Sequence, residues 1–241
     1  MYTILNKEFK SFFSNITGYI VIALFVVANA LFLWVLPGQW NVFDSGYASL
    51  DALFFLAPWL YLFLCPAVTM RFFAEERANG TIELLLTKPI SRFQIVMGKA
   101  MAGWLLVVVA LLPSVIWYFS VYILAEPMGN VDSGAFWGSW IGLLFLAAVY
   151  VAVGTFGSSL SSNQVVAFII SVVISFLLFY GFELVGSLFS GEIAYWLRQF
   201  GVNEHYKSIS RGVIDSRDLV YFIAVTIGFI YFTTKQIKNK R

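Results

Sequence analysis

The sequence predicts an all-α integral membrane protein with six transmembrane helices. Of its 241 residues, 60% are hydrophobic and only 12% are charged, whereas soluble domains carry about 25% charged residues. A helix that crosses a bilayer needs about 20 consecutive, predominantly apolar residues. Six stretches meet this requirement approximately: Ile16–Leu36, Leu50–Thr69, Met101–Ala125, Phe136–Ser158, Gln164–Leu184 and Leu219–Thr234. We therefore expect one transmembrane domain over residues 1–241, surrounded by the lipid bilayer.

The distribution of Lys and Arg predicts the orientation of these spans, because cytoplasmic loops of membrane proteins carry an excess of positive charge. With the N-terminus in the cytoplasm, eleven of the 15 Lys and Arg residues fall on the cytoplasmic side and four on the outer side. Both termini are therefore expected to be cytoplasmic. No basic stripe lies outside the membrane flanks, which argues against nucleic acid as a partner.

Residues 1–15 have the pattern of an amphipathic helix. Lys7 and Lys10 lie on its polar face. The apolar face consists of Tyr2, Leu5, Phe9, Phe12, Phe13 and Ile16. Such a helix is suited to lying in the cytoplasmic membrane interface. The alternative is a simple helical extension of the first span.

Residues 70–99, which we call the elbow, connect the second and third spans and are predicted to be structured. Asn79-Gly80 interrupts the chain, and Thr81 can cap a short helix that Pro89 would end. Glu83 would lie in the first turn of that helix, where the helix dipole favours an anion. A compact cytoplasmic elbow of this kind can serve as a docking surface. The alternative is a solvated connector.

Two further patterns mark helix ends and interruptions. Ser91 and Gln94 have the spacing of a capping box, which would start a helix that runs into the third span. Pro58, Pro66 and Pro113 fall inside apolar spans, and we expect them to kink or locally unwind those helices.

Small and polar residues inside the spans are candidates for packing or function. Gly134, Gly138 and Gly142 recur every four residues and place three bare backbones on one helix face, where another helix can approach closely. Packing within the chain's own bundle and pairing of two chains are both open. Asn29 is a polar group within the first span. Glu183 lies near the outer end of the fifth span, either snorkelling at the interface or paired inside the protein.

Residues 185–218 are too polar to cross the membrane as a simple helix. We expect short amphipathic helices in the outer leaflet, in a connection that partly re-enters the membrane. His205, the single histidine, lies beside Glu204 and is expected at the surface. One histidine cannot build a multi-histidine metal centre, and the phosphate-binding loop G-x-x-x-x-G-K-[ST] is absent. The sequence therefore predicts no metal, ATP or catalytic site on this chain.

The segment Phe73–Pro89, FAEERANGTIELLLTKP, resembles the permease subunits of ABC type-2 transporters. It contains an acid-x-Arg pattern formed by Glu75 and Arg77, a Gly-Thr-x-Glu motif that starts at Gly80, a run of leucines and a proline. The resemblance implies that the elbow docks on a separate ABC ATP-binding subunit, which would hold ATP and Mg²⁺. It also implies that the chain is a non-enzymatic transporter subunit that pairs with a second, identical or different permease.

The outer segment with His205-Tyr206 and Arg211-Gly212-Val213-Ile214-Asp215 resembles, more narrowly, the gliding-motility-associated permease subunits of Bacteroidetes. This resemblance implies a bacterial inner membrane and coupling of ATP hydrolysis to export or to gliding machinery. A membrane scaffold or anchor of a motility or secretion complex, without a substrate of its own, is the alternative function. An intramembrane enzyme acting on lipid would need a catalytic cluster, for which one histidine gives little support.

Overall fold

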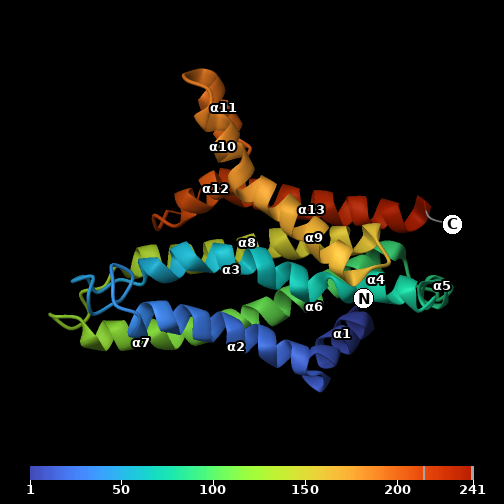
Figure 1. Ribbon diagram of the computed structural model, residues 1–241, viewed down its shortest axis with the longest axis horizontal. Helices are drawn as coiled ribbons and strands as arrows, with labels where there is room; N and C mark the ends of the chain where they lie inside the picture. The colour runs from blue at the N-terminus through green and yellow to red at the C-terminus, as the bar shows by residue number, and fades with distance from the viewer. Residues whose placement is uncertain (214, 240–241) are drawn as a thin grey trace.

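The computed structural model describes residues 1–213 and 215–239, and within them the protein is a bundle of α-helices without strands (Figure 1). Six helical segments are long and apolar enough to cross a membrane: Ile16–Val35, Asp51–Ala78, Arg92–Leu124, Ser133–Leu160, Gln164–Ser187 and Ser216–Ile237. The predicted fold class is confirmed. The N-terminus, α5 and the end of α13 lie at one end of the bundle, which we call the terminal end (Figure 1). Loops 36–50 and 125–132 lie at the other, the distal end.

The N-terminal region forms two consecutive helices that pack on the rest of the bundle. Its segments are α1 (Tyr2–Ser14), α2 (Ile16–Ala30) and a π-helical turn, η1 (Leu31–Val35). Helix α1 lies against the third span and buries Ile4 and Phe12. Tyr2 and Ile16, which the sequence pattern placed on the apolar face, are exposed. The buried residues of α1, Ile4 and Phe12, lie on one side of the helix. The face of α1 that the bundle covers is therefore narrower than its apolar face.

The second and third spans flank the elbow. The segments are α3 (Asp51–Thr69), α4 (Arg71–Ala78), α5 (Ile82–Leu86), α6 (Arg92–Leu111) and α7 (Pro113–Leu124). Pro113 interrupts the third span as predicted, because it begins the separate helix α7. Pro58 and Pro66 lie inside the continuous helix α3 and do not unwind it. The capping box is confirmed: Gln94 N donates to Ser91 Oγ, and Ser91 N donates to Gln94 Oε1, each at 3.2 Å.

Helix α8 (Ser133–Leu160) is the most buried of the spans and contacts α3, α6, α9, α12 and α13. A methyl group on Gly138 would lie 2.8 Å from the Cα of Gly212, and one on Gly142 would lie 3.3 Å from the Tyr206 ring. The backbone of Gly134 also lies close to Gly212. The glycine face of α8 is therefore occupied by the chain's own α12 region.

The fifth and sixth spans are joined by a bent, helical segment. The elements are α9 (Gln164–Phe176), η2 (Leu177–Gly181), α10 (Phe182–Ser187), α11 (Glu192–Gln199), α12 (Val202–Ile209) and α13 (Ser216–Asn239). Helices α10 and α11 form a hairpin that projects away from the bundle (Figure 1). The sixth span is longer than expected, because polar Ser216 and Arg217 belong to its first turn. Ile214, Lys240 and Arg241 lie outside the described residues.

Candidate functional site

Helices α3 and α4 meet at Met70, and the hydroxyl of Ser158 on α8 holds this junction. Ser158 Oγ donates to the carbonyl of Met70 at 2.8 Å and accepts from the backbone N–H groups of Phe73 and Ala74 at 2.9 and 3.2 Å. Backbone groups at a helix start lack partners within the helix, and leaving them buried and unpaired is costly. Ser158 of α8 therefore supplies hydrogen-bond partners to the backbone at the junction of the second span and the elbow.

Two glycines of α8 allow its neighbours to approach closely beside this junction. A methyl group on Gly154 would collide with Thr69 Oγ1 of α3, and one on Gly157 would collide with Ser171 Oγ of α9. Thr69 and Ser158 are fully buried. Small residues of this kind let membrane helices pack backbone against backbone. We call Thr69, Met70, Gly154, Gly157 and Ser158 the joint.

A buried lysine connects three helices at the terminal end. Lys99 of α6 is 2% exposed, and its Nζ lies 2.8 Å from Glu8 Oε1 of α1 and 2.8 Å from Glu76 Oε1 of α4. The ammonium also lies over the rings of Phe72 and Phe73, at 5.8 and 5.5 Å from their centroids, where the ring quadrupole attracts a cation. We call Glu8, Glu76 and Lys99 the charge triad. It ties the N-terminal helix and the elbow to the same point of the third span.

Neither Lys99 nor Glu76 was predicted from the sequence to have a role of its own. The signal that could have identified Lys99 is its setting, since it follows Gly98 and is itself followed by Ala100, Ala102 and Gly103 on a helix entering the membrane. A lysine among small residues in such a position requires a counter-charge, because an unpaired buried charge is strongly unfavourable. No sequence rule could have identified Glu8 as that partner, 91 residues away.

The tip of the elbow presents the predicted coupling residues to the surroundings. Glu75, Gly80, Thr81, Glu83 and Pro89 are all exposed, and Arg77 is half-buried. Within the described residues, none of these three charged side chains forms an ion pair with the rest of the chain. Their charges are therefore available to a partner.

The prediction that the Thr81 side chain caps α5 is wrong. Thr81 precedes α5, but its side chain accepts no bond from the helix; its hydroxyl instead donates to the carbonyl of Glu76 at 3.3 Å. The backbone of Thr81 is already helical, with φ −79° and ψ −10°, whereas a capping residue normally has an extended backbone that aims its oxygen at the helix start. Gly80, with φ +68°, makes the reversal that brings Thr81 back over α4.

A hollow lies beneath the elbow tip. It has a volume of about 520 Å³ and is lined by Arg77, Ile82, Glu83, Leu86 and Thr87 of the elbow, with Ser162 and Ile237 opposite. The short helix α5 is therefore not packed tightly on the bundle along this side. A partner segment can reach both faces of the elbow tip.

The polar candidates within the spans have internal partners. Asn29 is fully buried, and its Nδ2 donates to the carbonyl of Phe25 at 2.8 Å, while its Oδ1 has no hydrogen-bond partner. Glu183 accepts from the Lys207 ammonium at 3.0 Å and from the Asn203 amide. Glu183 is thus paired within the chain, through α12 residues that the sequence pattern did not connect to it.

The expectation of a surface histidine is wrong. The side chain of His205 is only 11% exposed, because its ring stacks on Tyr221 at 3.9 Å between centroids. Its Nδ1 lies 2.6 Å from Asp218 Oδ1, and its Nε2 lies 2.9 Å from the carbonyl of Gln199. The pairing of α12 with the start of α13, absent from any local pattern, covers this ring. His205 therefore fastens the outer segment to the sixth span.

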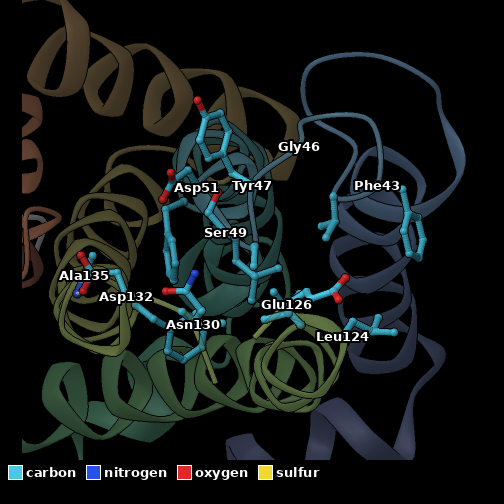
Figure 2. Close-up of a pocket in the computed structure, with 18 residues that line it drawn as sticks. Phe43, Gly46, Tyr47, Ser49, Asp51, Leu124, Glu126, Asn130, Asp132 and Ala135 are labelled. Carbon is cyan, nitrogen blue, oxygen red and sulfur yellow. The ribbon is translucent and has the colours of Figure 1, made fainter. Parts of the chain in front are cut away.

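The distal end holds a cavity of about 670 Å³ between loops 36–50 and 125–132 and the start of α8 (Figure 2). Its acidic lining residues are Asp51, Glu126 and Asp132, and its lining includes no Lys or Arg. Asp132 is engaged as a helix cap, since its Oδ1 accepts from Ala135 N at 2.9 Å. Among the described residues, no group of three His, Cys, Asp or Glu side chains could hold a metal ion.

These observations define a multi-span membrane protein with an exposed, charged elbow braced by buried polar contacts. The sequence profile of a family described as ABC-2 family transporter protein matches residues 41–211. This match covers most of the chain, and the chain belongs to that family. It is a membrane permease domain, a non-catalytic transporter subunit of a class that works with ATP-binding subunits. A search among curated proteins finds no match.

Proposed function

We propose that the elbow tip is the docking surface for a separate ATP-binding subunit and that the joint and the charge triad transmit its motion into the membrane. The observation that carries this proposal is the contrast within the elbow. Glu75 and Glu83 are exposed and unpaired at the tip, whereas Lys99 and Ser158 fix its base to the bundle. A surface that receives force needs free contact groups, and the lever behind it needs to be stiff.

The direction of transmission follows from the helices that continue from the elbow. The second span, α3, continues into α4 of the elbow at Met70. The third span begins with α6, which follows the capping box of Ser91. ATP-driven closure of two ATP-binding subunits would displace two such elbows together, and each elbow would carry two spans as rigid bodies. The charge triad would carry α1 with them, because Glu8 and Glu76 share Lys99.

The orientation that fits this function places the terminal end in the cytoplasm of a bacterial cell and the distal end outside its inner membrane. The excess of Lys and Arg on the terminal side supports it. In this orientation α1 would lie at the cytoplasmic interface. The α10–α11 hairpin would lie at the level of the outer leaflet.

The proposal has two further parts. The chain pairs with a second permease, and the complex drives export or gliding machinery. A single chain has six candidate spans, and ATP-binding subunits that close on each other would need two elbows. The motility role rests on the resemblance of the outer segment alone. An anchoring role without a substrate would be favoured if the elbow proved dispensable.

The elbow is tested by reversing its charges. The variants Glu75→Arg and Glu83→Arg should each weaken binding of the ATP-binding subunit about tenfold, because a like charge would replace an attractive one at the docking surface. The measurement is co-purification in mild detergent, with ATPase activity of the complex as a second readout. The ATP-binding subunit itself would be identified by mass spectrometry of the wild-type complex.

The matched control is Glu192→Arg, which reverses an exposed charge on α11 at the far side of the protein. It should leave both readouts unchanged. Wild-type co-purification and ATPase activity in both elbow variants would refute docking at the elbow tip and favour the scaffold.

A further inference from the structure

A groove of about 490 Å³ lies beside the distal half of α3, between this helix and the segments η2, α10 and α12. Its volume is within the range of about 300–1,000 Å³ that is typical of small-molecule sites. One part of its wall is apolar and mostly aromatic, formed by Phe54, Phe55, Pro58, Trp59, Phe179 and Tyr180. The other part is polar and comes mainly from α10 and α12.

The aromatic wall is held in place by contacts between its own rings. Trp59 meets Phe179 edge-on, with centroids 5.8 Å apart, and lies 5.8 Å from the Tyr180 ring. Phe179 is buried, whereas Phe55 is 56% exposed and faces out of the bundle. Tyr206 anchors the wall from below, because its hydroxyl donates to the carbonyl of Phe54 at 2.9 Å. The apolar surface is therefore preformed and open on one side.

The polar part of the groove offers charges of both signs. Lys207 is 53% exposed, and it uses one of its three N–H donors on Glu183. Asp51, at the first turn of α3, is exposed, and its carboxylate has no hydrogen-bond or ion-pair partner among the described residues. A ligand carrying both a cation and an anion would complement this pair, with the cation on Asp51 and the anion on Lys207.

The two parts are arranged as a lipid is arranged in a leaflet. Asp51 is at the distal start of α3, and Trp59 is eight residues, or about 12 Å, further into the bundle. Glu183 lies three residues beyond Tyr180, at the start of α10, where the chain turns away from the bundle (Figure 1). In the orientation proposed above, the charged part meets the outer interface and the aromatic part lies at acyl-chain depth.

We propose that this groove binds a phospholipid of the outer leaflet whose headgroup carries an ammonium as well as a phosphate. The ammonium would face Asp51, the phosphate would face Lys207, and one acyl chain would lie along Phe55 and Trp59. Binding uses only residues of this chain and does not require an ATP-binding subunit. The site therefore stands or fails independently of docking at the elbow.

The test is lipid retention by the full-length protein, measured by native mass spectrometry. The protein is equilibrated in mild detergent with equal amounts of phosphatidylethanolamine and phosphatidylglycerol, which share the phosphate and differ in the ammonium. The wild type should retain phosphatidylethanolamine in preference. Asp51→Asn should reduce that preference about two- to fivefold, as expected for loss of one partly exposed charge contact. Trp59→Ala should reduce retention of both lipids.

Matched variants separate the groove from general charge effects. Glu192→Gln removes an exposed carboxylate of α11 that does not line the groove, and it should leave the preference unchanged. Lys207→Gln should lower retention of both phospholipids, and Lys207→Arg should restore it. An unchanged preference in Asp51→Asn, or an equal change in Glu192→Gln, would overturn the proposal.

Photo-crosslinking identifies the occupant directly. Phosphatidylethanolamine with a diazirine in its acyl chain should label peptides that contain Phe55, Trp59 and Tyr180 more strongly than peptides of α2 and α13. Even labelling of all exposed helices would overturn the proposal. Labelling that disappears in a purified dimer would assign the groove to a second copy of the chain instead, and would equally overturn it.

Discussion

The joint at the base of the elbow and the α10–α11 hairpin differ in what covers their side chains. In the joint, Thr69 and Ser158 are fully protein-covered, and the bonds of Ser158 reach across to another helix. In the hairpin, Leu188 is 80% exposed and Trp196 is 63% exposed, although both are large and apolar. The joint is thus completed by the chain itself, whereas the hairpin leaves its apolar surface to lipid or to another protein.

This difference explains how one apolar composition can serve two purposes. Where helices are packed as one body, small residues such as Gly154 let a neighbouring helix approach closely, and buried hydroxyls fix their relative position. Where a segment must accommodate a changing environment, large side chains are presented outward and few contacts define its position. The stiff end is the one that carries the elbow, as the proposed force-transmitting role requires.

The largest effect is expected from removing the central cation of the charge triad. Lys99→Met would leave Glu8 and Glu76 facing each other in a partly buried place. Among the described residues, Glu8 would keep only its 3.6 Å ion pair with the exposed Lys7, and Glu76 would keep none. Breaking a buried ion pair by removing one partner costs about 3–5 kcal/mol. We expect a corresponding loss of stability in thermal unfolding of the detergent-solubilised protein, followed by loss of ATPase stimulation.

The exposed Lys88 of the elbow provides the matched control, because Lys88→Met removes the same charge and Lys88 has no ion pair within residues 1–213 and 215–239. The triple variant Glu8→Gln, Glu76→Gln, Lys99→Met should recover most of the lost stability, since no uncompensated charge remains. Equal stability of Lys99→Met and Lys88→Met would show that the triad does not brace the elbow.

The second largest effect is expected where a side chain of α3 packs directly on the bare backbone of α8. Gly154→Ala would drive a methyl group into Thr69 Oγ1, and such overpacking costs about 1–3 kcal/mol. Gly228→Ala on α13, where the added methyl meets no atom within 4 Å, should leave the melting temperature unchanged or raise it slightly. Combining Gly154→Ala with Thr69→Ala should restore part of the stability. A neutral Gly154→Ala would mean that α3 and α8 can slide apart.

The limits of sequence reasoning follow the same division between regions. Span positions and the capping box were predictable, because apolar length and the Ser91–Gln94 spacing are local properties. The Glu8–Lys99 pair and the bonds of Ser158 were not, because Glu8 and Lys99 are 91 residues apart and Ser158 bonds to residues 84 to 88 positions away. The His205 error has the same origin: its neighbour in sequence is polar, but its cover comes from Asp218 and Tyr221 on another helix.

The elbow motif was predictable for a different reason. Its residues Glu75, Gly80 and Glu83 are exposed and lie close together in the sequence, so no tertiary contact was needed to recognise them. The base that supports them was hidden, because its residues are ordinary Ser, Gly and Thr on separate spans. A family motif therefore predicted the proposed docking surface, whereas only the structure located the brace behind it.

A smaller effect separates two neighbouring serines at the end of α8. Ser158→Ala removes the acceptor for the N–H groups of Phe73 and Ala74, and leaving buried donors unsatisfied costs about 1–3 kcal/mol. Ser159→Ala, equally buried, removes only a bond to the carbonyl of Phe156 in its own helix and should cost less. The comparison is made by thermal unfolding and by ATPase stimulation. A larger loss in Ser159→Ala would locate the brace elsewhere.

The smallest effect on stability is expected in the hairpin, and it sharpens the contrast with the joint. Trp196→Gln replaces a mostly exposed ring and should change the free energy of unfolding in detergent by less than about 0.5 kcal/mol, as for substitutions away from packed regions. Ala194→Gln on the same helix is the matched variant, because Ala194 is 8% exposed and its carbonyl lies against Gly186. It should cost about 1–3 kcal/mol through overpacking. A large loss in Trp196→Gln would instead show that the hairpin folds back onto the bundle in solution, and the two regions would then be equally closed.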